Sequence, residues 1–71
     1  MRYLVVVEKG PTSYGAYVPD LPGCVAAGDT KDEVITLIRE AIEFHLEGMA
    51  QDGEPIPLPA STSELVEVAA A

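Results

Sequence analysis

Residues 30–50 read TKDEVITLIREAIEFHLEGMA, and this stretch holds both the start signal and the buried face of one long helix. Thr30 and Glu33 form a capping box, in which a hydroxyl and a carboxylate each satisfy a backbone N–H group that the helix start leaves free. Acidic residues in the first turn also complement the helix dipole. Gly53 supplies a stop signal just beyond. The sequence therefore predicts a capped helix that runs to about Ala50.

The apolar face of this helix is wide. Its members recur at helical spacing: Val34, Ile35, Ile38, Ala41, Ile42, His45, Leu46 and Met49. Leu37 and Phe44 extend the face sideways, so that it covers about half of the circumference at about 100° per residue. Packing on one sheet needs less than this. Leu37 and Phe44 therefore either contact a second subunit, as in a homo-oligomer (dimer or tetramer), or lie under the proline-rich segment that follows.

Three short strands are predicted before the helix. Residues 2–8 are β-forming, and their unbroken apolar centre is typical of an interior strand. Residues 14–18 form a second strand, and residues 24–27 a third whose small side chains let a helix pack closely. Between them, residues 19–23 read PDLPG. Two prolines fix φ there, and Gly23 permits a backbone conformation closed to other residues, so this segment is predicted to be a rigid corner.

The chain after the helix is predicted to return along the domain. Residues 53–60 read GEPIPLPA, and alternate prolines favour an extended strap of roughly 25 Å at about 3.1 Å per residue. Residues 64–68 alternate polar and apolar side chains, which predicts a last, half-exposed strand. The order is β-β-β-α-β, and the predicted fold class is α+β: an antiparallel sheet with one helix on a face, in a single domain over residues 1–71.

Charge and composition narrow the function. Twelve acidic and four basic residues give a net charge of −8 among 71 residues. This field repels phosphates, so we expect no direct nucleic-acid binding, and it attracts a basic partner. No apolar run approaches the ~20 residues of a membrane span, and a single cysteine fits the reducing cytoplasm. So short a chain buries only about 60% of its unfolded surface, which favours self-association.

No catalytic constellation is evident. Cys24 has one candidate base, His45, but both residues sit in apolar patterns typical of packing positions. The predicted second and third strands carry no acidic residue, so a nuclease-like metal site is not expected. No glycine-rich phosphate loop is present. The sequence predicts neither an enzyme nor a cofactor.

The corner and the helix start carry a resemblance. The run YGAYVPDLPGC at 14–24, followed by Ala26-x-Gly28-Asp29-Thr30-x-Asp32-Glu33, resembles the N-terminal domain of the HicB family of antitoxins. REAI at 39–42 and DGEPIP at 52–57 are similar to it as well. The resemblance implies a partial RNase H-like fold without nuclease activity. It also implies binding to HicA, a small basic mRNA-cleaving toxin whose active site the antitoxin covers. Many members add a C-terminal DNA-binding module, which residues 1–71 do not contain.

Two functions stay open at this point. The first is an antitoxin that sequesters a basic HicA-type toxin. Glu40, Glu43 and Glu47 are its candidate contacts, because spacings of three and four align them on one helix face. Asp20 and Leu21 of the corner are further candidate contacts, although a structural role is expected for them first. The second function is an orphan oligomeric domain that binds a small ligand or another protein in a groove beside the strap.

Overall fold

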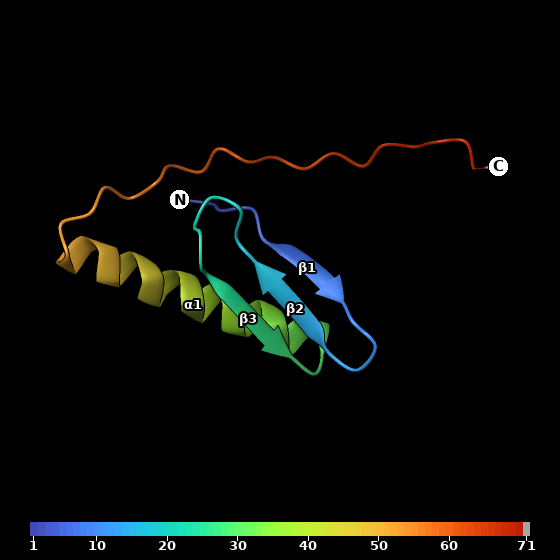
Figure 1. The fold of residues 1–71 in the computed structure, drawn as a ribbon, viewed down its shortest axis with the longest axis horizontal. Helices are drawn as coiled ribbons and strands as arrows, with labels where there is room; N and C mark the ends of the chain where they lie inside the picture. The colour runs from blue at the N-terminus through green and yellow to red at the C-terminus, as the bar shows by residue number, and fades with distance from the viewer. Residues whose placement is uncertain (71) are drawn as a thin grey trace.

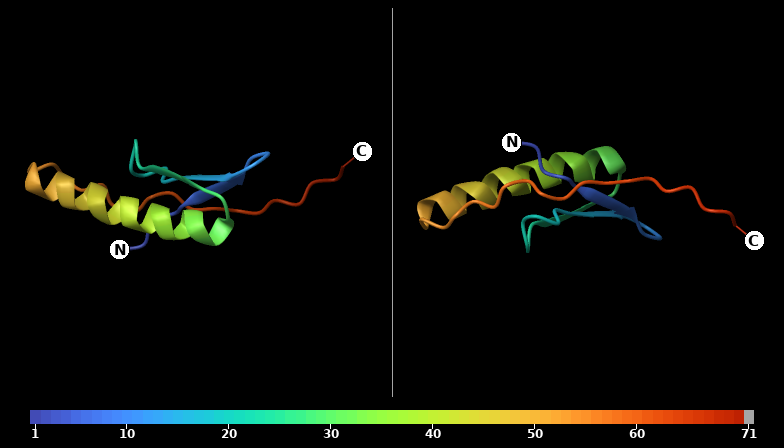
Figure 2. Two further views of the ribbon diagram at one scale, coloured as in Figure 1. Left: turned by 90° about the horizontal axis from the view of Figure 1, so that it is seen from below. Right: turned by 90° about the horizontal axis from the view of Figure 1, so that it is seen from above.

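The structure, a computed structural model, describes residues 1–70. Three strands, β1 (Val6–Lys9), β2 (Tyr14–Tyr17) and β3 (Val25–Gly28), precede one helix, α1 (Lys31–Gln51). The strands form one antiparallel sheet in the order β1-β2-β3. The helix lies across one face of this sheet, so the body has two layers (Figure 1 and Figure 2). The predicted α+β class and the β-β-β-α order are confirmed.

The core lies between α1 and the two strands β2 and β3, against which the helix packs far more than against β1. Its six buried residues are Ala16, Val18, Leu21, Cys24, Val34 and Ile38. Small residues bring the two layers together, since Ala16 of β2 lies opposite Ala26 of β3 on the sheet. A Cβ atom on Gly28 would lie 3.1 Å from the Val34 backbone nitrogen, so the end of β3 and the first helical turn meet closely.

Both ends of α1 carry the predicted signals. The Thr30 hydroxyl accepts a hydrogen bond from the Glu33 backbone N–H at 3.1 Å. The Glu33 carboxylate accepts from the N–H of Asp29 at 3.3 Å, one residue before the position that an ideal capping box uses. At the other end Gly53 has φ +70°, and the N–H groups of Gly53 and Glu54 donate back to the helix. These two bonds form a Schellman motif, which explains why the helix stops there.

The corner between β2 and β3 is rigid, as predicted. Gly23 has φ +84°, a left-handed value that favours glycine. The Leu21 N–H donates to the Val18 carbonyl at 3.1 Å, and the Cys24 N–H donates to the Leu21 carbonyl at 3.1 Å. This tight winding turns the Leu21 side chain into the core, where no part of it is exposed.

Two predictions about strands are wrong. The first strand is not interior: β1 stands at an edge of the sheet and pairs only with β2. Residues 64–68 form no strand, because the strap carries them past the sheet without a neighbouring edge to pair with (Figure 1). The described chain therefore extends 51 Å along its longest axis and only 16 Å along its shortest. Among residues 1–70, no helix has the length and apolar character needed to cross a membrane.

Candidate protein-binding surfaces

The strap, residues 54–61, is fixed to the body at two points. The Asp20 carboxylate accepts hydrogen bonds from the backbone N–H groups of Ala60 and Ser61, both at 2.9 Å, and from the Ser61 hydroxyl at 2.8 Å. These bonds, the Ser61 N–H first, lower the pKa of Asp20 below its ordinary value. The Tyr3 hydroxyl donates to the Pro57 carbonyl near the other end. The strap is thus a held segment, although only Pro57 and Ser61 within it are partly buried.

The corner therefore has a structural role: Asp20 holds the strap, and Leu21 packs in the core. Leu21 is fully buried, so it presents no surface to a partner, and the expected partner contact at this residue is corrected. The Asp20 carboxylate is occupied by the strap. This long-range contact had no local signal in the sequence, because the bonded residues are 40 and 41 positions apart.

The outward side of α1 carries an acidic ridge, defined as Glu40, Glu43 and Glu47, and all three side chains are exposed. Phe44 borders this ridge, because it lies four residues after Glu40 and three before Glu47, and residues at these spacings are neighbours on a helix surface. Its side chain is 80% exposed. Leu37, one turn earlier on the same flank, is half-buried. The helix surface therefore presents an exposed aromatic ring, Phe44, beside the carboxylates of Glu40 and Glu47.

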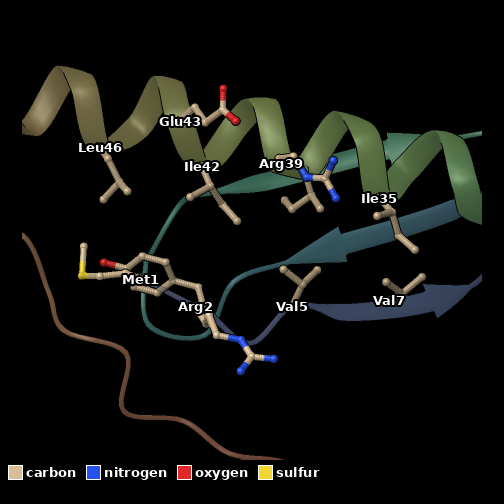
Figure 3. Close-up of a pocket in the computed structure, with 11 residues that line it drawn as sticks. Met1, Arg2, Val5, Val7, Ile35, Arg39, Ile42, Glu43 and Leu46 are labelled. Carbon is tan, nitrogen blue, oxygen red and sulfur yellow. The ribbon is translucent and has the colours of Figure 1, made fainter.

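An apolar groove of about 680 Å³ lies on the other side of the helix, between α1 and the β1 side of the sheet. Val5 and Val7 form one wall, and helix residues including Ile35, Ile42 and Leu46 form the other (Figure 3). Arg2, Arg39 and Glu43 also line it, together with Met1, Tyr3 and Ile38. The groove exists because α1 packs on β2 and β3 and leaves β1 uncovered. The wide apolar arc of the helix was its signal in the sequence, since Ile35, Ile42 and Leu46 belong to it.

The chemistry-bearing residues lie apart from these surfaces. Cys24 is buried in the core, and burial raises the pKa of its thiol, which disfavours the nucleophilic thiolate. His45 is half-buried on α1. In residues 1–70, no three His, Cys, Asp or Glu side chains gather in a way that could hold a metal ion. The described surface offers exposed apolar area and carboxylates.

The family follows from comparison with known proteins. A family model described as "HicB_like antitoxin of bacterial toxin-antitoxin system" matches residues 3–70. The chain therefore belongs to the HicB-like antitoxin family.

Three relatives illustrate this membership. An uncharacterized 14.9 kDa protein of Haemophilus phage HP1 is 47% identical over 57 residues, which are 80% of this chain but 43% of that protein. The N-terminal domain of Burkholderia pseudomallei antitoxin HicB has a similar structure, with a TM-score of 0.73 and 39% identity over 82% of this chain and 69% of the other. A chain from the HicA3 and HicB3 toxin-antitoxin complex gives a TM-score of 0.71 and 30% identity over 84% and 70%. The described domain thus spans less than half of the phage relative.

Proposed function

We propose that this chain is an antitoxin domain that binds a basic HicA-type toxin in the cytoplasm and covers its RNA-binding surface. We assign the contact to the acidic–aromatic face, defined as Glu40, Glu43, Phe44 and Glu47. The observation that carries this assignment is the exposure of Phe44 beside the exposed carboxylates of Glu40 and Glu47. Family membership and the structural similarity to a chain from a HicA3–HicB3 complex support the partner class.

Electrostatics gives the contact its direction. An mRNA-cleaving toxin must bind phosphates, so its working surface is positive. Carboxylates on one helix face can occupy the places that phosphates would take, and a net charge of −8 accelerates the encounter. The same charge opposes direct binding of this chain to nucleic acid. Inhibition then needs no chemistry from this chain, only occupation of the toxin surface.

Phe44 supplies what charge alone lacks. Rim carboxylates mainly raise association rates, whereas buried aromatic residues at the centre of an interface contribute most of the affinity. Phe44 has acidic neighbours on the helix surface at positions i−4 and i+3, so an exposed apolar side chain lies directly beside charged ones. We therefore place Phe44 at the centre of the toxin contact.

This placement revises the expected role of Leu37 and Phe44 as an oligomer contact. A symmetric dimer brings the same surface patch of both copies together. Around Phe44 this would oppose the Glu40 and Glu47 carboxylates of one copy to those of the other, and like charges across an interface cost several kcal/mol. The flank therefore suits a basic partner better than a second copy.

Replacement of Phe44 by Ala tests the proposal. We expect the dissociation constant for a HicA-type toxin from the same genome to rise at least about 30-fold, the ~2 kcal/mol of an interface hot spot. Titration calorimetry with a catalytically inactive toxin measures this change. The control is Leu58→Ala, because Leu58 is a comparably exposed apolar side chain (75%) on the strap. Equal affinities of Phe44→Ala and wild type would contradict the assignment, as would a larger loss for Leu58→Ala.

The apolar groove supports the alternative, an orphan domain that binds a small ligand or another protein there. Its volume suits a small molecule, since ligand pockets measure roughly 300–1,000 Å³. It lies on the opposite flank of α1 from Leu37 and Phe44, so the two functions separate experimentally. If this chain acts only through the groove, Phe44→Ala should leave binding of the groove ligand unchanged, because Phe44 does not line the groove.

A further inference from the structure

The edge of β1 and the groove beside it form an incomplete part of the fold. β1 pairs with β2 on one side, and the N–H and C=O groups on its other side have no strand to bond to. An open edge of this kind is a template for another strand. Val5 and Val7, which line the groove, are only partly buried because α1 does not cover them. A further strand beside β1 would satisfy the edge and cover the groove at once.

Residues 64–68, ELVEV, have a β-forming sequence but pair with no strand in the described part of the chain. Leu65 is fully exposed, and Val66 and Val68 are 77% and 75% exposed. Such exposure of adjacent β-forming residues is unusual for a segment whose start is fixed, and here Asp20 holds the chain at Ala60 and Ser61. The following residues leave the body, and both figures show the last described part of the chain extending well beyond the sheet (Figure 1 and Figure 2).

We propose that residues 64–68 of one copy pair with the β1 edge of a second copy, and that two chains exchange these segments reciprocally. This inference does not rest on toxin binding, because it uses the β1 side of α1, whereas Phe44 lies on the other flank and Glu43 alone of the acidic–aromatic face borders the groove. A reciprocal exchange gives a closed two-fold dimer. It enlarges a core that contains only six buried residues in one copy.

The side-chain pattern of the segment fits the proposed site on both faces. Alternate residues of a strand point to opposite sides, so Val66 and Val68 share one face and Leu65 lies on the other. Beside β1, the valine face covers the groove. Leu65 then joins the outer face of the sheet, where Val6 of β1 lies next to Tyr17 of β2. The apolar groove and the outer face each receive an apolar side chain.

The basic residues near the β1 edge also favour pairing with an acidic strand. The chain has four basic residues, and two of them, Arg2 and Arg39, line the groove, while Lys9 ends β1. Three of its four positive charges therefore lie along this side, beside two carboxylates, Glu43 of the groove and Glu8 of β1, in a molecule whose net charge is −8. The segment brings Glu64 and Glu67, one on each of its faces. Opposite charges across paired strands stabilise the pairing.

The test is sedimentation of the wild-type chain and two variants at tens of micromolar, with helix content followed by circular dichroism. We expect the wild type to be a dimer and Val66→Asp to raise the dimer dissociation constant at least tenfold with helix content unchanged. Val25→Asp is the matched control, because Val25 is 65% exposed on β3, at the other edge of the sheet, and it should stay dimeric. A monomeric wild type, or dissociation by Val25→Asp and not by Val66→Asp, would overturn the proposal.

Nuclear magnetic resonance on a mixture of isotope-labelled and unlabelled chains distinguishes exchange from folding back within one chain. We expect contacts between the Val66 or Val68 methyl groups of one chain and the Val7 or Ile42 methyl groups of the other. The same contacts found only within a single chain would overturn the exchange, and so would random-coil shifts throughout residues 64–68. This readout needs no variant.

Discussion

The sequence left two roles open for Asp20, a structural one and a partner contact, and in the structure it has the structural one. Its carboxylate gathers two backbone N–H groups and one hydroxyl from the strap. The sequence indicated the rigidity of the corner, because proline and glycine act locally. It did not indicate the strap contact, because nothing in PDLPG specifies a partner some 40 positions away. Leu21 illustrates the same limit, since its neighbours in the sequence do not reveal that its side chain turns inward.

Protonation of Asp20 should release the strap. The folded-state pKa of this carboxyl is lowered, so the clamp contributes its full stability above the ordinary pKa of an aspartate and loses it as pH falls through the lower, folded-state pKa. We expect the amide resonances of Ala60 and Ser61 to titrate together, with a midpoint below the ordinary aspartate value. The control is Asp20→Asn, in which these resonances should not follow that titration. Titration at or above the ordinary value would contradict the clamp.

At the scale of elements, the helix was the most predictable part. Its start, its stop and its apolar face each rest on local sequence. The structure places the start and the stop within a residue or two of the prediction, and the buried residues Val34 and Ile38 belong to the predicted face. The second and third strands lie within a residue of their predicted positions, whereas β1 begins four residues later than predicted and residues 64–68 form no strand. The apolar run before Glu8 indicated an interior strand, whereas β1 lies at an edge. An apolar run indicates a β-forming segment, but it does not indicate whether the strand lies inside the sheet or at its edge.

Replacing Thr30 by Ala measures the helix start directly. The hydroxyl of Thr30 satisfies the Glu33 N–H at 3.1 Å, so its loss should lower the free energy of unfolding by about 0.5–2 kcal/mol. Chemical denaturation measures the change. Thr36→Ala is the matched control, because the Thr36 hydroxyl donates to the Asp32 carbonyl, which the helix backbone can satisfy without it. We expect almost no change for Thr36→Ala, and equal effects of the two substitutions would argue against the cap.

At the scale of the whole molecule, helix α1 lies between two surfaces, the acidic–aromatic face and the apolar groove. Glu40, Phe44 and Glu47 lie on one flank of α1, and the other flank borders the groove, which Glu43 also lines and where most of the few basic residues lie. A toxin and a second copy could therefore bind at the same time. The sequence predicted the acidic ridge from spacing alone, but the division between flanks emerged only when the position of the sheet under the helix was known.

The central claim, that the acidic–aromatic face binds a basic toxin, is tested most directly by association kinetics of a Glu40→Gln, Glu43→Gln, Glu47→Gln triple variant. We expect several-fold slower association with a HicA-type toxin at low salt. The difference should shrink near 0.5 M salt, where the screening length is about 4 Å. A triple variant with Asp29 and Asp32 changed to Asn and Glu54 to Gln, all exposed, carries the same net charge and should associate faster than the ridge variant. Identical low-salt rates for the ridge variant and the wild type would contradict the claim.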